Sequence, residues 1–304
     1  MPVAATLLAF ITIFLWSFLA YLGSRLTHVP PFLLVGIALC TSGVLGLIKI
    51  REWRVPLKTY LVGIGGIFGY HFLYFTAFQY APPIETSLIN YLWPLLIVVL
   101  SPLYLRGYSL RSYHLFGALL GSSGAGLIAT GGHFTLDLAN VVPNALTGYL
   151  FAAAAAFTWA SYSLLTKRLP PFPSGAVGGF CLGSGFLSLG IYFQSSTLLG
   201  AALTLQDWIL LILLGAGPMG LAFFTWDATL KRGDPRIIGS LAYLTPLLST
   251  FFLIVLGGQK LSWVSGVAMV LIVSGAVTGS LDLLRSTNRI TEEPSSLSHT
   301  QPHN

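Results

Sequence analysis

The chain has 304 residues, of which 15 are Lys or Arg and 9 are Asp or Glu, so only 8% are charged while 55% are hydrophobic. Soluble domains carry about 25% charged residues, so this composition excludes a soluble protein and favours a polytopic membrane protein. The net charge of +6 does not indicate a nucleic-acid binder, because the basic residues are dispersed, and Cys40 and Cys181 fit neither a disulfide scaffold nor a metal site.

Apolar runs bounded by charge, Pro or Gly predict an all-α protein with ten transmembrane helices and short loops. We expect these helices at residues 3–22, 31–48, 59–80, 84–105, 113–131, 145–166, 174–193, 206–230, 236–256 and 261–284. The first run is not expected to be a signal peptide, because no basic residue precedes it and no small-residue cleavage site follows. Residues 286–304 are polar and are expected to form a disordered cytoplasmic tail.

The third span places polar aromatic residues near the middle of the membrane. Tyr70, His71 and Tyr74 lie ten to fourteen residues after Tyr60, which is ~15–21 Å into a core of ~30 Å. Tyr70 and Tyr74 share a helix face, and we expect them to line a binding cavity; hydrogen bonding between helices is the alternative. His71 is a candidate for a ligand-binding or proton-linked role, or for a histidine satisfied within the bundle.

The fourth and ninth spans each contain a proline that interrupts helical hydrogen bonding. Pro94 leaves the carbonyl of Asn90 without its helical partner, and Pro246 does the same in the ninth span. With Tyr91 and Trp93, the first of these segments is expected to hold an ammonium or carboxylate group beside an aromatic wall. Tyr243 is its counterpart in the ninth span, and a kink needed only for helix shape is the alternative.

Further candidates lie in the first, sixth and eighth spans. Trp16 and Trp159 either line the cavity or pack against neighbouring helices. Gly217 and Pro218 make the eighth span pliable, for gating or merely for close packing. Close packing is also expected at Gly65-x-x-x-Gly69 and Gly117-x-x-x-Gly121.

The basic residues indicate how the chain is oriented. If the amino terminus is cytoplasmic, thirteen basic residues are cytoplasmic and only Arg25 and Lys260 are not. The thirteen are Lys49, Arg51, Arg54, Lys58, Arg106, Arg111, Lys167, Arg168, Lys231, Arg232, Arg236, Arg285 and Arg289. We therefore expect a multi-pass protein of the inner membrane with both termini in the cytoplasm.

The sequence also repeats itself. The segment YLWPLL at 91–96 recurs as YLTPLL at 243–248, and Trp16 and Arg25 recur 143 residues later as Trp159 and Arg168. A repeat of five spans is odd, so the second half must cross the membrane in the opposite direction, as in secondary transporters. We predict a first repeat over residues 1–135 and a second, inverted repeat over 136–285, arranged around a central cavity.

Ten spans, the inverted repeat, the tryptophan in the first span of each half and the Y-L-x-P-L-L segments resemble the drug/metabolite transporter superfamily, EamA type, over residues 3–284. The segments 14–25 and 69–98 are most similar to its bacterial YddG-type exporters of aromatic amino acids. This resemblance implies a secondary transporter that works by alternating access in the bacterial inner membrane. It implies no cofactor, no metal and no required oligomer.

The acidic residues bear on the substrate. Glu85, Asp227 and Asp282 lie near span ends, and Asp227 is expected to pair with Lys231. A cation exporter would need a buried carboxylate, so we expect a neutral zwitterion such as an aromatic amino acid. A broad metabolite or drug exporter is the alternative, and a serine enzyme at Gly183-Ser184-Gly185 is disfavoured because His71 is its only intramembrane partner. Uniport and proton-coupled antiport both stay open.

Overall fold

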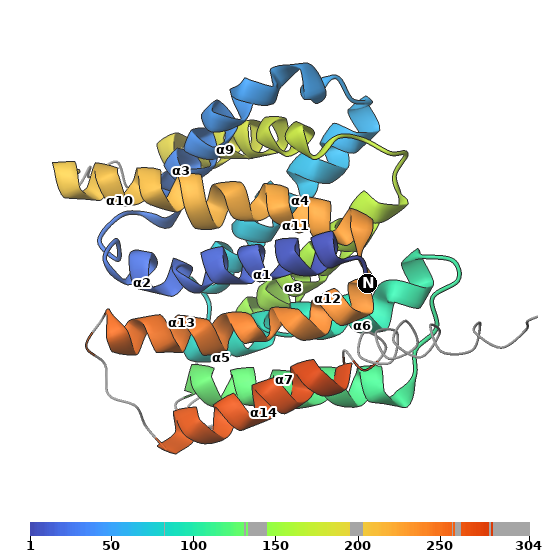
Figure 1. Ribbon diagram of the computed structural model, residues 1–304. Helices are drawn as coiled ribbons and strands as arrows, with labels where there is room; N and C mark the ends of the chain where they lie inside the picture. Colours follow the sequence, from blue (N-terminus) through green and yellow to red (C-terminus); the bar gives the residue numbers. More distant parts are fainter. Residues whose placement is uncertain are drawn as a thin grey trace, which may run out of the picture.

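The computed structural model describes residues 1–81, 83–130, 132, 145–194, 203–256, 258, 263–279 and 281, and its regular elements are helices (Figure 1). Several predictions lie outside the described residues. They concern Lys260, Asp282, Arg285, Arg289, the tail at 286–304, the repeat boundary at 135/136 and the side chain of Glu85.

The helices follow the ten predicted spans, some of them in two or three pieces. The first half contains α1 (Val3–Ser17) and α2 (Leu19–Ser24), α3 (Pro31–Gly46) with the 3-10 segment η1 (Leu47–Trp53), α4 (Leu57–Ala77), α5 (Pro83–Asn90) and α6 (Trp93–Tyr104), and α7 (Ser112–Thr130). The second half contains α8 (Ala145–Arg168), the 3-10 turn η3 (Ser174–Ala176) with α9 (Val177–Gln194), α10 (Leu205–Ala216), the π-helical turn η4 (Gly217–Leu221), α11 (Ala222–Arg232), α12 (Pro235–Ala242), α13 (Leu244–Val255) and α14 (Trp263–Gly279).

Six continuous helical stretches of the described chain are long and apolar enough to cross a membrane. They are Val3–Ser24, Pro31–Trp53, Leu57–Ala77, Ala145–Arg168, Ser174–Gln194 and Leu205–Arg232. The fourth and ninth spans are divided, because α5 ends at Asn90 and α6 begins at Trp93, while α12 ends at Ala242 and α13 begins at Leu244. A proline lies in the first turn after each division, Pro94 in α6 and Pro246 in α13, and it has no N–H to continue the helical ladder.

The two halves run in opposite directions. Met1, where the chain enters α1, lies against Gly233, which follows the end of α11. The Nζ of Lys167, near the end of α8, donates a hydrogen bond of 2.6 Å to the carbonyl of the same Gly233. Helix α1 therefore begins, and its repeat counterpart α8 ends, at one end of the bundle, which we call the Met1 end. In Figure 1 this end is marked by the N.

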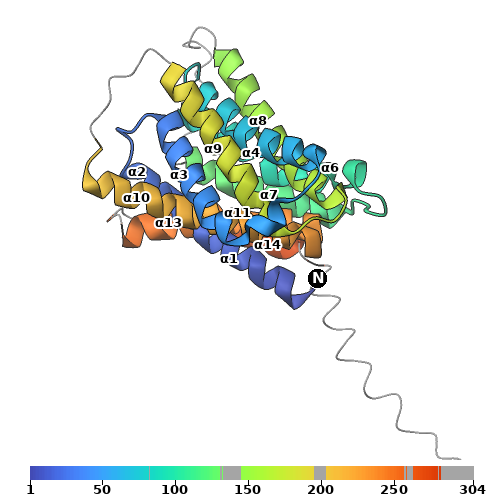
Figure 2. The same ribbon diagram turned by 90° about the horizontal axis from the view of Figure 1, so that it is seen from above.

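Helices of one half pack mainly on helices of the other. The pairs are α3 with α9, α7 with α14, α6 with α12, α1 with α11, and α4 with α8. Figure 2 shows α3, α9, α4 and α8 from above, with members of the two halves interleaved. The pairing is symmetric under exchange of the two halves. Helix α3 packs on its own repeat counterpart α9, and α7 packs on its counterpart α14. The contact of α1 with α11 corresponds to the contact of α8 with α4. The fold is thus two inverted five-helix repeats around a central cavity.

Glycines allow two of these helices to approach closely. A Cβ at Gly117 would lie 2.4 Å from the backbone nitrogen of Gly279, and 2.7 Å from the carbonyl oxygen of Gly275. The expected packing of Gly65-x-x-x-Gly69 is wrong, because nothing lies within 4 Å of a Cβ at Gly65. The close contacts of α4 are instead made by Gly63 and Gly66 on its buried face, against Phe180 and Tyr162.

Candidate functional site

A central cavity of about 460 Å³ lies between the two halves. This volume is in the range of roughly 300–1,000 Å³ that is typical of small-molecule sites. Leu26, Thr27 and Val29, in the connection between α2 and α3, line the cavity, and Thr27 is exposed at the surface. The cavity therefore extends to the end of the bundle opposite Met1.

The sequence-predicted site residues come together at this cavity. Those that line it are Trp16, Tyr70, His71, Tyr74, Asn90, Tyr91, Trp93, Pro94, Trp159, Pro218, Tyr243 and Pro246. Gly217 is not among the residues that line it; it is the first residue of η4, directly after α10 ends at Ala216. A substrate-binding or gating role for each of these residues stays a prediction. Sequence reasoning missed Phe75, Leu214, Met219, Phe223, Thr245 and Ser249 as lining residues.

Four tryptophans meet at the inner end of the cavity. The ring of Trp16 lies 5.8 Å from that of Trp93 and 5.9 Å from that of Trp159, measured between centroids. Behind them, Trp226 lies 4.9 Å from Trp16 and is 1% exposed. Trp16 and Trp159 both line the cavity and also pack against each other. Lining the cavity and packing between helices were the two alternatives for these residues, and both apply. Sequence reasoning did not single out Trp226 as part of this cluster. A signal was present, because the repeat offset of 151 residues that relates Phe72 to Phe223 also relates Phe75 to Trp226.

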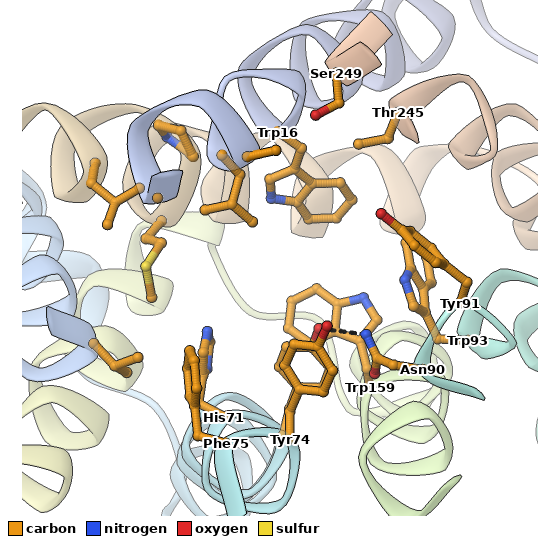
Figure 3. A pocket seen from close by; sticks show the side chains of 18 of the residues that line it. Trp16, His71, Tyr74, Phe75, Asn90, Tyr91, Trp93, Trp159, Thr245 and Ser249 are labelled. Carbon is orange, nitrogen blue, oxygen red and sulfur yellow. Dashed lines mark hydrogen bonds between the residues drawn. The ribbon is translucent and has the colours of Figure 1, made fainter. Parts of the chain in front are cut away.

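Tyrosines of α4 form a second wall. Tyr70 and Tyr74 stack with their centroids 5.8 Å apart, as their shared helix face requires. Asn90 Nδ2 donates to the Tyr70 hydroxyl at 3.1 Å, and the Tyr74 hydroxyl lies 3.2 Å from Ser87 Oγ. Asn90, at the end of α5, therefore fixes this wall and is 5% exposed (Figure 3).

The tyrosines at the two helix breaks differ in where their hydroxyls lie. Tyr243 is fully buried, and its hydroxyl is 2.5 Å from Ser122 Oγ on α7. Tyr91 and Ser249 instead direct their oxygens toward the cavity in Figure 3. Tyr91 can thus offer a hydrogen bond to a ligand, while the Tyr243 hydroxyl has a partner in the fold.

The described residues that line the cavity include no Asp, Glu, Lys or Arg. Their polar groups are hydroxyls, indole N–H groups, one amide and the imidazole of His71. Within the described part of the chain, no three His, Cys, Asp or Glu side chains gather as a metal site. Such a cavity can hold a ligand by stacking and neutral hydrogen bonds, but offers no counter-ion to a ligand with a net charge.

Packed side chains close the Met1 end of the cavity. Trp226 Nε1 donates to Ser163 Oγ at 3.0 Å, and Thr12 Oγ1 lies 2.7 Å from Thr225 Oγ1. One turn further along α11, Lys231 Nζ donates to Asp227 Oδ2 at 2.6 Å, as the sequence predicted. The cavity is therefore open at one end of the bundle and sealed at the other.

Comparison with known proteins was made with the whole chain. The model of the EamA-like transporter family matches residues 3–130 and 146–280. The aromatic amino acid exporter YddG of Ancylobacter novellus is 40% identical over 289 residues, which cover 91% of this chain and 97% of that protein. The Escherichia coli protein of the same name is 26% identical, covering 85% and 90%, and the Escherichia coli biotin transporter is 26% identical, covering 76% and 78%. A crystal structure, 39% identical, matches with a TM-score of 0.86 over 94% of this chain and 99% of that one.

Proposed function

The chain belongs to the EamA-like transporter family, and we propose that it exports aromatic amino acids across the bacterial inner membrane through the central cavity. The family is one of transporters, so the serine-enzyme alternative at Ser184 falls away. The observation that carries the proposal is the cavity itself, whose described lining is rich in aromatic residues and includes no Asp, Glu, Lys or Arg. The similarity of the chain to exporters named for aromatic amino acids supports the same substrate class.

The physical match is between the cavity and a zwitterion with a large ring. The tryptophans and tyrosines give stacking and edge contacts to an aromatic side chain. A substrate whose ammonium and carboxylate neutralise each other has no need of a charged partner in the protein, whereas biotin, with one carboxylate, would lack one here.

We further propose that the Met1 end faces the cytoplasm, together with both termini. Lys167, Lys231 and Arg232 all lie at this end, as the excess of basic residues on cytoplasmic loops requires. The cavity then opens to the outside, which corresponds to the outward-facing state of a carrier that works by alternating access. Because the described residues of the cavity walls include no Asp or Glu, we expect facilitated transport down the substrate gradient.

The test is uptake of labelled Phe, Tyr and Trp into proteoliposomes. We expect saturable flux that falls about tenfold or more in Trp93→Ala and Tyr74→Ala, because each removes a ring that the substrate would contact. Phe157→Ala is the matched control, since Phe157 is 48% exposed on the outside of α8, two residues before Trp159. An imposed pH gradient should leave the steady level of uptake unchanged.

The proposal fails if flux is absent, or if all three variants behave alike. Stronger inhibition by biotin than by tryptophan would favour a broader metabolite exporter instead. Accumulation driven by the pH gradient would leave export standing but contradict facilitated transport.

A further inference from the structure

His71 is held in one tautomer by its own helix. Its Nδ1 lies 2.7 Å from the carbonyl oxygen of Ile67, one turn earlier in α4. A carbonyl oxygen only accepts hydrogen bonds, so Nδ1 carries the proton. In the neutral ring the other nitrogen, Nε2, is then a lone-pair acceptor.

This acceptor is available to a ligand. His71 lines the central cavity, and Figure 3 shows a nitrogen of its ring directed into the open space. Among the described residues, Nε2 has no hydrogen-bonding partner, and the side chain is only 7% exposed. When a ligand fills the cavity and displaces water from Nε2, a hydrogen-bond donor on the ligand would offset the loss of that water.

Three aromatic rings surround the imidazole. The ring centroids of Tyr70, Phe75 and Phe223 lie 5.0, 6.4 and 6.2 Å from that of His71. All three residues also line the cavity. Aromatic faces attract cations within about 6 Å of the ring centroid, more strongly where water is excluded. Together with the lone pair of Nε2, these rings form a neutral cage that favours a compact positive group with N–H donors.

We propose that His71, with Tyr70, Phe75 and Phe223, forms the subsite that binds the primary ammonium group of the transported amino acid. The inference rests on the proposed function and deepens it, because it assigns one end of the substrate to one wall of the cavity. The cage contains no carboxylate, so it holds the ammonium through the Nε2 lone pair and the faces of the rings. The sequence left His71 between a ligand-binding role, a proton-linked role and a structural one; this geometry favours ligand binding.

The test pairs variants of His71 with ligands that lack one group. Purified protein in detergent binds labelled tryptophan, and unlabelled tryptophan, tryptamine and indole-3-propionate compete; tryptamine lacks the carboxylate, and indole-3-propionate lacks the ammonium. His71→Asn can keep the bond to Ile67 while removing the group at the Nε2 position, whereas His71→Gln can place its amide oxygen there. His114→Asn is the control, because His114 is a fully buried histidine outside the cavity lining.

We expect indole-3-propionate to compete at least tenfold more weakly than tryptophan for the unaltered protein. His71→Asn should weaken tryptophan and tryptamine about tenfold or more, the effect of losing a hydrogen bond to a charged group, and leave indole-3-propionate within about twofold. His71→Gln should recover most of the loss, and His114→Asn should leave the ratios between ligands unchanged.

Equal weakening of all three ligands by His71→Asn, or an unchanged response to tryptamine, would overturn the ammonium site. If the unaltered protein binds no tryptophan, the proposed function fails. Labelled tryptamine then tests the cage alone: binding that His71→Asn abolishes would support it, and anything else would contradict it.

Discussion

Asp227 and Lys231 form the most deeply buried ion pair described in the molecule. The Asp227 side chain is 1% exposed and that of Lys231 is 19% exposed. Lys231 Nζ also donates to the carbonyl oxygen of Phe172 at 2.9 Å and lies 3.3 Å from the centroid of its ring. The pair therefore ties α11 to the segment before α9 and helps to seal the Met1 end.

Removing one partner of this pair should destabilise the protein strongly. Asp227→Asn leaves the Lys231 ammonium without a counter-charge in a largely buried site, which typically costs about 3–5 kcal/mol. Replacing both, with Asp227→Asn and Lys231→Met together, should recover most of the stability, because no unpaired charge is then buried. The midpoint of thermal unfolding in detergent measures this; a double variant less stable than Asp227→Asn would contradict it.

Individual residues also show where sequence reasoning ends. Tyr70, Tyr74 and Asn90 could be placed in the cavity because polar groups at mid-membrane need partners. Leu214, Met219 and Phe223 could not, because a helix in lipid is apolar on its outer face as well. Hydrophobic periodicity therefore does not tell which apolar side chains face the cavity.

At the scale of the element, the α7–α14 contact depends on glycine. A Cβ at Gly117 would collide with the backbone of α14, which cannot move aside as a side chain can. Gly117→Ala should therefore lower stability by about 1–3 kcal/mol. Gly65→Ala is the matched control, because its Cβ would meet nothing and alanine has the higher helix propensity, so stability should be unchanged or raised by up to about 1 kcal/mol.

Thermal unfolding of the two variants side by side measures the difference. A Gly117→Ala protein as stable as Gly65→Ala would mean that the two helices do not need this close approach.

Helix breaks were more predictable than helix contacts. Pro94 and Pro246 divide their spans for a local reason, the missing N–H, so the sequence alone indicates the interruption. The packing of Gly65 depends on what lies opposite it, and the same G-x-x-x-G pattern occurs on packed and on open faces of these helices.

At the scale of the whole molecule, the inverted repeat could be predicted from the matched segments at 91–96 and 243–248. Which end is open could not, because two similar halves with opposite orientation can exchange conformations at little cost in energy. The end that is open depends on which end of the cavity is sealed, and here the contacts around Trp226 seal the Met1 end. The halves differ at matched positions, such as Trp93 and its repeat counterpart Thr245.

The most direct measurement combines the cavity, its orientation and its ligand. Ser249 lines the cavity on α13, while its repeat counterpart Ile97, 152 residues earlier, is fully buried on α6 and does not line it. In a protein with Cys40 and Cys181 replaced, Ser249→Cys and Ile97→Cys are treated in whole cells with a membrane-impermeant thiol reagent. We predict that Ser249→Cys is labelled quickly, that tryptophan slows this labelling while alanine does not, and that Ile97→Cys is labelled slowly. Equal labelling of the two cysteines, or labelling of Ser249→Cys that tryptophan leaves unchanged, would contradict an outward-facing cavity that binds aromatic amino acids.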